Sequence, residues 1–472
     1  MLLQKFQVSS FLKTVFTIAI PIALQNLLGT TAGMVDTIMI GSEGQLAVAA
    51  VGICAQFHGL FSTSCSGFII GAMLFFSQYW GARNHAGINK TFCLSYLFGL
   101  GISCLYTICA FAAPEFVLHV YTDKENIVSI AVPYLRIVAF TYPLHVLSSL
   151  LIALMRTTDR VKAPLFCSIF SLIINFCLNF VLIYGRFGFP KLGVTGAAVG
   201  TLVASLVNFL SLWVYFFASK CDLRLKLREM FDFRGDFFKM YLSKCLPVVC
   251  NDFLYGVGQT LINIVIGHQT ESAIAAMAAF RVLEGFVFAF FGGLADASSV
   301  VVGKDVGSGK PMAAYRNAFA FAILCPMITL CICAGMFFAS NPLLSLFSLE
   351  SEALSYGKYM LLIYLAAGTI RTCNYIMNTC YRAGGEAVFG TVLETSCLFL
   401  ISIPATWIAG MVLRLPFIAV FSFIYTDELI RLIFELRYTR SGKWIKPVTD
   451  EGRAALPAFQ TELKLLRTRT QS

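Results

Sequence analysis

One acidic residue, Asp36, interrupts a long apolar stretch near the start of the sequence, within VDTIMIG. Gln25, Gly29 and Gly33 precede it at spacings of four, four and three residues, so a helix would place all four on one face. A carboxylate among apolar residues is costly unless it faces a cavity or a partner. Such a group can exchange a proton or Na⁺ as its surroundings change. The pattern predicts an ion-binding site at Asp36; the alternative is an aspartate at a helix end that faces water.

Two amides, Asn175 and Asn179, lie four residues apart in another apolar stretch and would share one face of a helix. An asparagine offers a carbonyl oxygen to a cation but cannot itself titrate. We therefore expect the pair to assist an ion site; the alternative is a hydrogen bond that joins two helices. Tyr142, directly before Pro143, is a further polar candidate in the first half.

Charged residues are more numerous within the apolar stretches of the second half. Arg281 and Glu284 are three residues apart and would pair on one helix, and Asp296, Arg371 and Glu394 follow. We interpret them as a structural network of near-balanced charge; the alternative is contact with a substrate. The residues predicted to line a substrate cavity are Gln25, Asn26, Tyr142, Asp252, Tyr255, Arg281, Glu284 and Arg371.

The elements that position these residues are long apolar segments. The chain has 472 residues, of which 58% are hydrophobic and only 13% are charged, where a soluble protein has about a quarter charged. Runs of roughly 20 apolar residues can cross a bilayer, and they must be helical because lipid cannot hydrogen-bond to an open backbone. We predict an all-α integral membrane protein with twelve transmembrane helices, at 14–40, 46–79, 91–113, 127–153, 164–184, 193–219, 240–266, 272–302, 316–339, 355–380, 387–409 and 415–436.

The basic residues predict the orientation. Most of the 35 Lys and Arg fall in inner segments when both termini are placed in the cytoplasm, in agreement with the positive-inside rule. The net charge of +10 is thus spread over short loops, which argues against nucleic-acid binding. We expect the lipid bilayer to be a partner of this protein, with both termini on its cytoplasmic side.

An internal duplication organises the chain. A shift of 226 residues places Pro21 on Pro247, Gly81 on Gly307 and Arg156 on Arg382 without a gap. An offset of six helices predicts two parallel six-helix repeats, as in several transporter folds. The predicted parts are an N-terminal lobe (1–219), a cytoplasmic linker (220–244) with the amphipathic stretch LRLKLREM, a C-terminal lobe (245–440) and a cytoplasmic tail (441–472). The same offset aligns Asp252 with Asn26.

Several motifs resemble one family. VDTIMIGSEGQLAVAAVG and GFIIGAMLFFSQYWGAR resemble the first two helices of the multidrug and toxic compound extrusion family, and GGLADASSVVVGKDVGSGK resembles its eighth helix. LMRTTDRVKAP, CYRAGGEAVFG and RYTRSGKWIKPVT resemble its fourth helix, tenth helix and bacterial tail. The resemblance implies a V-shaped, two-lobed exporter. It also implies outward antiport of organic, often cationic, compounds by alternating access, driven by inward H⁺ or Na⁺.

The resemblance also assigns residues. Asp36 matches the acid of helix one that takes part in cation coupling, and Thr201 in GAAVGT matches a threonine near that site. Asn179 stands where many members have aspartate, so one carboxylate rather than two is expected there. One branch of the family holds a cation between acids at the positions of Tyr255 and Arg371, so the second-lobe site of that branch is expected to be absent.

Other functions are less consistent with the sequence. A lipid-linked saccharide flippase of the same superfamily is the main alternative, since Arg281 and Arg371 would suit an anionic headgroup. A receptor or scaffold leaves the duplication and Asp36 unexplained. No Walker motif, metal-ligand spacing or catalytic triad is found in the sequence. We therefore expect no enzymatic activity and no cofactor apart from the coupling H⁺ or Na⁺.

Overall fold

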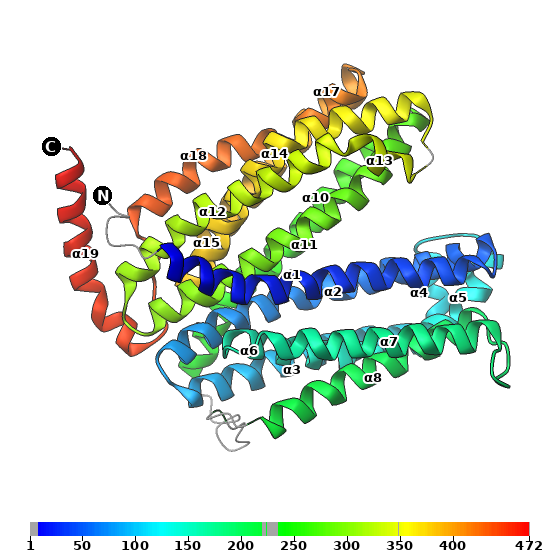
Figure 1. Ribbon diagram of the computed structural model, residues 1–472, viewed down its shortest axis with the longest axis horizontal. Coiled ribbons are helices and arrows are strands. Elements are labelled where there is room, and N and C mark those ends of the chain that lie inside the picture. The colour runs from blue at the N-terminus through cyan, green and yellow to red at the C-terminus, as the bar shows by residue number, and fades with distance from the viewer. Residues whose placement is uncertain (1–7, 220–222, 224–234, 348, 472) are drawn as a thin grey trace. The chain divides into compact units, whose positions relative to one another are not determined.

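Helices account for almost all regular structure in the part of the chain that the computed structural model describes, residues 8–219, 223, 235–347 and 349–471. Figure 1 shows them connected mostly by short turns, and no strand occurs among these residues. The helices of the first half are α1 (Val8–Gly41), α2 (Gln45–Gly81), α3 (His85–Ala112), α4 (Pro114–His119), α5 (Glu125–Val138), α6 (Thr141–Thr157), α7 (Lys162–Tyr184) and α8 (Val194–Ala218).

The second half repeats this order of long helices. Its elements are α10 (Gly235–Gly267), α11 (Glu271–Gly307), α12 (Pro311–Phe338), α13 (Ser340–Ser345), α14 (Ser351–Gly384), α15 (Val388–Cys397), η1 (Leu398–Ser402), α16 (Ile403–Trp407), η2 (Ile408–Val412), α17 (Phe417–Phe423), α18 (Thr426–Ser441) and α19 (Asp450–Gln471). From α15 to η2 the backbone stays helical. One π-helical segment, η1, precedes Pro404 and another, η2, follows it.

The described helices agree with the twelve predicted spans. Ten are long and apolar enough to cross a membrane, and the pair α5 and α6, bent by 47°, makes an eleventh. We count α17 and α18 as the twelfth span. Composition alone does not identify it, because α18 carries Asp427, Glu428, Arg431 and Glu435, all of them buried.

Two features of the structure differ from the sequence prediction. The span predicted at 127–153 is broken between Val138 and Thr141, and the tail predicted at 441–472 contains the helix α19. The predicted linker 220–244, with LRLKLREM, falls mostly outside the described residues.

Contacts between residues divide the chain into two compact units. The first, here called the N-terminal unit, comprises Leu24–Phe76 and His85–Tyr241. The second, the C-terminal unit, comprises Met1–Ala23, Ser77–Asn84 and Leu242–Ser472. The helices α1, α2 and α10 therefore each belong to both units. The predicted lobe boundaries, at 219 and 245, remain a prediction.

A glycine-mediated crossing of α2 and α11 lies within the C-terminal unit. A Cβ atom built on Gly81 would lie 2.3 Å from the carbonyl oxygen of Lys304, and one built on Gly307 would lie 2.0 Å from that of Gln78. The 226-residue offset exchanges Gly81 with Gly307 and Gln78 with Lys304. The two contacts are therefore copies of each other, which is the packing expected where equivalent helices of parallel repeats meet.

We expect Gly307→Ala to destabilise the protein, since the added methyl group would overlap a backbone carbonyl that cannot rotate away. Overpacking of this kind typically costs about 1–3 kcal/mol. Gly335→Ala on α12 is the matched control, because a Cβ there meets no atom within 4 Å. Thermal unfolding of the two purified variants checks the prediction, and equal midpoints would contradict the close approach at Gly307.

The segment that follows α18 is anchored in the C-terminal unit. Trp444 is fully buried, and the backbone N–H of Lys446 donates a hydrogen bond to the carbonyl of Gly384 at 2.7 Å. The N–H of Val448 donates to Oε1 of the buried Gln78 at 2.8 Å. The start of α19 is thereby fixed beside the ends of α2, α11 and α14.

Candidate functional site

The carboxyl group of Asp36 is held by a side chain from α7. Asn179 donates a hydrogen bond from Nδ2 to Asp36 Oδ1 at 2.7 Å, and both residues lie in the N-terminal unit. Asp36 is half-buried, while Asn179 is fully buried. Among the described residues nothing donates a hydrogen bond to Asp36 Oδ2, so this oxygen is available to a proton or a cation.

Asn179 is itself fixed by its neighbours. Its Nδ2 also lies 3.3 Å from Oδ1 of Asn175, one turn earlier on α7. Its Oδ1 lies against α8, where a Cβ on Gly200 would come within 2.3 Å. That buried oxygen accepts no hydrogen bond from the described residues. The predicted grouping of Asp36, Asn175 and Asn179 is thus present, with one titratable group and one uncommitted amide oxygen.

A second polar contact joins α1 to α7 nearer the start of both helices. Gln25 donates from Nε2 to Ser168 Oγ at 3.0 Å and accepts at Oε1 a hydrogen bond from Arg156 Nη2 at 2.7 Å. Gln25–Ser168 and Asp36–Asn179 have the same separation of 143 residues, so the two helices run parallel. The contacts lie about 16 Å apart along α1 at 1.5 Å per residue.

The face of α1 between these two contacts is open. Gly29 and Gly33 are exposed, and a Cβ built on either would meet no atom within 4 Å. The small residues predicted to share a face with Asp36 therefore leave space beside its carboxyl group. No other part of the described N-terminal unit packs against α1 at Gly29 or Gly33.

Among the described residues, two of the predicted ones form no hydrogen bond to Asp36 and make other contacts. Thr201 on α8 donates from Oγ1 to the carbonyl of Ala197 at 2.9 Å, within its own helix. Tyr142 is fully buried, and its ring stacks on Phe61 at a centroid distance of 4.5 Å. The aromatic cluster around Tyr142 also contains Phe57 and His58.

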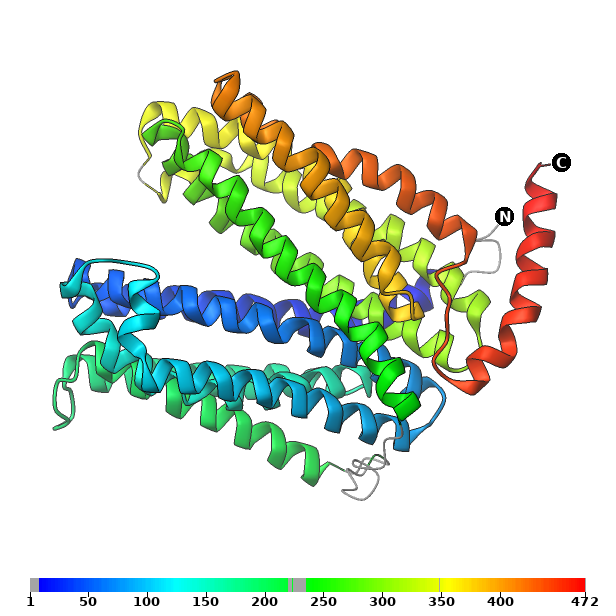
Figure 2. The same cartoon turned by 180° about the vertical axis from the view of Figure 1, so that it is seen from behind.

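The second half contains a copy of the Gln25 cluster. Asn251 donates from Nδ2 to Glu394 Oε2 at 3.0 Å, again across 143 residues, and Arg382 lies 4.0 Å from the same oxygen. Figure 2 shows the green α10 beside the orange helix that runs from α15 to η2. The 226-residue offset maps Gln25, Arg156 and Ser168 onto Asn251, Arg382 and Glu394. The sequence prediction missed these clusters, although the offset was the signal that could have revealed them.

Glu284 on α11 is the centre of one part of the second-half network. Arg281 donates to its Oε2 at 2.9 Å, and Arg371 on α14 donates to its Oε1 at 2.6 Å. The Tyr425 hydroxyl donates to Oε1 at 3.2 Å, and Arg371 also donates to the hydroxyl of Tyr255 at 2.6 Å. Both guanidinium groups are therefore engaged by Glu284.

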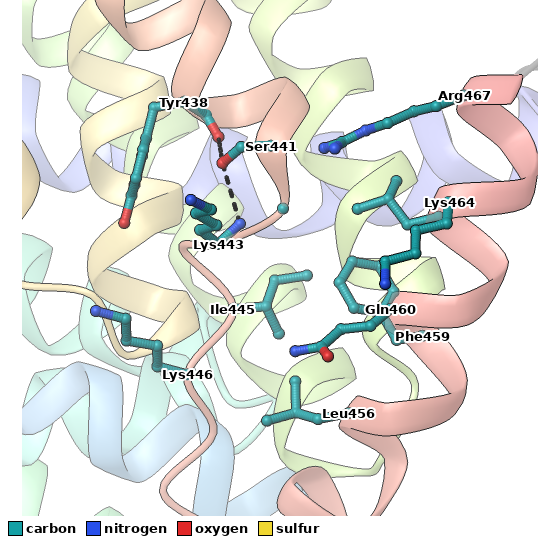
Figure 3. Close-up of a pocket in the computed structure, with 12 residues that line it drawn as sticks. Tyr438, Ser441, Lys443, Ile445, Lys446, Leu456, Phe459, Gln460, Lys464 and Arg467 are labelled. Atoms are coloured by element: carbon teal, nitrogen blue, oxygen red, sulfur yellow. Dashed lines mark hydrogen bonds between the residues drawn. The ribbon is translucent and has the colours of Figure 1, made fainter.

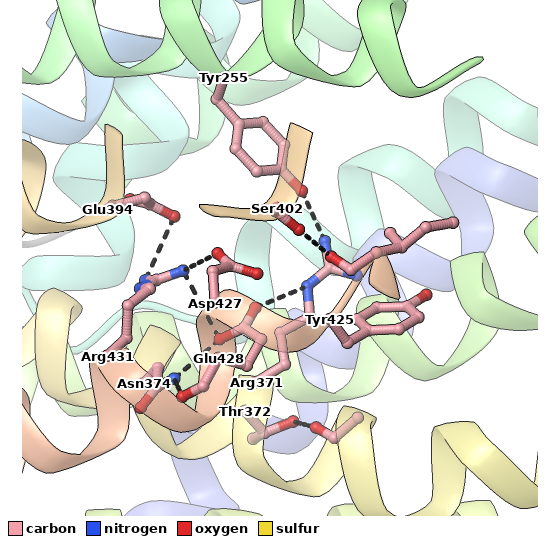
Figure 4. A network of polar contacts seen from close by, with 12 residues as sticks. Tyr255, Arg371, Thr372, Asn374, Glu394, Ser402, Tyr425, Asp427, Glu428 and Arg431 are labelled. Atoms are coloured by element: carbon pink, nitrogen blue, oxygen red, sulfur yellow. Dashed lines mark hydrogen bonds and ion pairs between the residues drawn. The ribbon is translucent and has the colours of Figure 1, made fainter. Parts of the chain in front are cut away.

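Arg431 on α18 is the centre of the other part, which Figure 4 shows. Its guanidinium nitrogens lie 3.4 Å from Glu394, 3.5 Å from Glu428, 3.5 Å from Glu435 and 4.0 Å from Asp427. Arg431 is only 4% exposed and Glu435 is fully buried. One arginine thus neutralises parts of four carboxyl groups inside the C-terminal unit.

Asn26 and Asp252 are the remaining predicted residues. Both are half-buried and each has a polar or charged neighbour. They lie on α1 and α10, at positions related by the repeat offset.

Comparison with known proteins identifies the family. The family model MatE matches the chain twice, over residues 21–181 and 247–408. The chain belongs to the MatE family. The two matches begin 226 residues apart, at Pro21 and Pro247, and they confirm the predicted duplication.

Relatives of this MatE chain extend over nearly its whole length. An uncharacterized transporter YisQ of Bacillus subtilis is 22% identical and covers 92% of this chain and 95% of its own. A probable multidrug resistance protein YoeA of the same organism is 24% identical, with coverages of 88% and 91%. A probable multidrug resistance protein NorM of Thermotoga maritima is 21% identical, with coverages of 94% and 95%.

Solved structures share the fold. A MOP superfamily transporter from Pyrococcus furiosus, described as having a binding pocket of reverse polarity, superposes with a TM-score of 0.82 at 18% identity. A multidrug resistance MATE family transporter in an outward-facing conformation gives 0.81 at 18% identity. Each comparison covers 91% of this chain and 95% of the other. The all-helical, multi-span membrane fold predicted from the sequence is confirmed, and the family is one of transport proteins.

Proposed function

We propose that this MatE protein is an antiporter that exports organic, mainly cationic, compounds in exchange for inward H⁺ or Na⁺ by alternating access. The observation that carries the proposal is the Asp36–Asn179 contact, which places one carboxyl group between α1 and α7 with Oδ2 available. Family membership and the names of the relatives YoeA and NorM as probable multidrug resistance proteins support it.

In this proposal Asp36 binds the coupling ion, and Asn175 and Asn179 orient the carboxyl group of Asp36. Asn179 donates to Asp36 Oδ1 in either protonation state, so gaining or losing a proton at Oδ2 does not disrupt the contact. For Na⁺, the amide oxygen of Asn175 is an additional hard ligand one turn earlier on α7, whereas Oδ1 of Asn179 lies against Gly200 of α8. Exchange of ion for cargo then requires only one titratable group.

The membrane, the orientation and the oligomeric state of the transporter are part of the same proposal. We place it in a bacterial inner membrane as a monomer, with both termini in the cytoplasm. The excess of Lys and Arg in the segments assigned to the inner side supports this orientation.

The flippase alternative depends on arginines that are free to bind a diphosphate. Arg281 and Arg371 instead both bind Glu284, at 2.9 and 2.6 Å. No contact in the described part of the C-terminal unit therefore favours the flippase over the exporter.

Uptake of a fluorescent organic cation into inside-out membrane vesicles tests the proposal. A proton gradient or a sodium gradient, imposed separately, is expected to drive accumulation that vesicles without the protein do not show. The gradient that works identifies the coupling ion. Accumulation of the dye that is independent of both gradients, or that requires ATP, would rule out an ion-coupled antiporter.

If H⁺ is the coupling ion, replacing Asn179 by Leu is expected to tighten proton binding at Asp36 about 10–100-fold, since it removes a hydrogen bond that stabilises the charged carboxylate by about 1.5–3 kcal/mol. Thr201→Val is the matched control, because its hydroxyl bonds within α8 and not to Asp36. The ion concentration that gives half-maximal transport measures the effect. A larger change in this concentration for Thr201→Val than for Asn179→Leu would show that Asn179 does not set the ion affinity of Asp36.

A further inference from the structure

A groove runs between the end of α18 and the helix α19, in the C-terminal unit (Figure 3). Its volume is about 620 Å³, within the range of pockets that hold small molecules. The two helices and the connection between them form its walls. None of the residues considered above for ion coupling or substrate contact lines it.

The floor of the groove is apolar. Leu456, Phe459 and Leu463 recur at spacings of three and four residues, so they form one stripe along α19. Phe459 is 3% exposed and Leu463 is 7% exposed, and Ile445 from the connection lies beside them. Gly442 allows this approach: it has a φ of 66°, and a Cβ on it would lie 2.7 Å from Leu463.

The rim of the groove is basic. Lys443, Lys446, Lys464 and Arg467 line it, and no acidic residue is among the lining residues. Lys446 pairs with Glu386, and Arg467 donates to the carbonyl of Arg440 at 2.7 Å. Neither Lys443 nor Lys464 forms an ion pair within the described chain, so these two ammonium groups are available to an external anion.

The groove lies where a membrane surface must be. α18 completes the twelfth span and ends at Ser441, and the lining residues begin at Tyr438 and continue through Lys446 into α19. A site at the end of a transmembrane helix faces the headgroup layer, whichever side of the membrane it is on. Basic residues at that level attract anionic lipids, at about 1 kcal/mol for each Lys or Arg.

We propose that this groove binds an anionic phospholipid, with the phosphodiester between Lys443 and Lys464 and the glycerol and upper acyl chain on Leu456, Phe459 and Leu463. The basic rim matches the charge of the headgroup, and the apolar floor matches the part of the lipid that a free anion lacks. The site is independent of the transport function proposed above. It holds α19 against the membrane beside α18.

Lipid binding to the full-length protein in nanodiscs tests this proposal. Phosphatidylglycerol with a spin or fluorescent label on its acyl chain is titrated into phosphatidylcholine discs, and the fraction bound is measured. Lys443→Gln with Lys464→Gln is expected to weaken the binding of phosphatidylglycerol about 25-fold, from about fivefold for each charge. Glycerol phosphate, which has the charge but no acyl chains, is expected to compete poorly.

The matched control is Lys162→Gln with Lys239→Gln. These two exposed lysines lie near the starts of α7 and α10, so the substitutions remove the same charge outside the groove. It is expected to bind phosphatidylglycerol as the wild type does. Equal weakening in both double variants would show a diffuse charge effect and overturn the proposal. Strong competition by glycerol phosphate, or by an acidic peptide, would overturn the assignment of the groove to a lipid.

Discussion

Replacing Asp36 by Asn is expected to abolish gradient-driven accumulation of cargo while the protein still folds. Asparagine has nearly the same shape and keeps an oxygen that accepts the hydrogen bond from Asn179, which the wild type forms at 2.7 Å. It cannot take up or release a proton, and it lacks the charge that binds Na⁺. The change therefore removes ion exchange without removing the contact between α1 and α7.

The size of the effect follows from the stoichiometry. When one monovalent ion exchanges for one monovalent cation, the membrane potential makes no contribution, and a tenfold ion gradient supports about tenfold accumulation of cargo. Purified Asp36→Asn in proteoliposomes should reach only the level seen without a gradient. Wild-type accumulation in this variant would show that another group couples the ion.

Glu43→Gln is the control, because it removes another carboxyl group close to the C-terminal end of α1. Glu43 pairs with the exposed Lys191 at 3.0 Å, and such surface pairs contribute about 0–1 kcal/mol. We expect this variant to retain coupled transport.

Replacing Arg431 by Met is expected to destabilise the protein by about 3–5 kcal/mol, since it removes the shared partner of buried carboxyl groups. Four carboxyls lie within 4.0 Å of this guanidinium, and Glu435 forms no hydrogen bond through either carboxyl oxygen within the described chain. Methionine fills much of the same volume, so the loss is one of charge rather than of packing.

Thermal unfolding at two pH values measures this effect. Protonation of the unpaired carboxyls at low pH removes their repulsion, so the variant should recover part of its lost stability as the pH falls. Lys191→Met is the control, with an expected loss of no more than about 1 kcal/mol. An Arg431→Met protein as stable as the wild type at neutral pH would mean that these carboxyls are already neutral.

The fold was largely predictable from the sequence because its signals are local or periodic. Apolar length identified the spans, and the match of Pro21 with Pro247 and of Gly81 with Gly307 identified the repeats. The spans were hardest to place where an apolar run is broken in the structure or where a spanning helix carries buried charges. The break between Val138 and Thr141 and the charged helix α18 are the two examples.

The candidate site was predictable only within single helices. The shared face of Asn175 and Asn179 follows from their spacing, but the contact of Asn179 with Asp36 depends on how α1 packs on α7. Packing also decides that Thr201 bonds within α8 and that Tyr142 is enclosed by aromatic rings. Nor does spacing show that Gln25 binds Arg156, because 131 residues separate them.

The most direct test of the account is a count of the ions that the purified protein releases when it binds an organic cation. If Asp36 alone exchanges ion for cargo, binding should release about one H⁺ or one Na⁺ per cargo molecule. The ion should also weaken cargo binding by the same factor by which cargo weakens binding of the ion. Cargo binding by the wild type without any ion release, or undiminished release from Asp36→Asn, would contradict the claim that this carboxyl group couples the two.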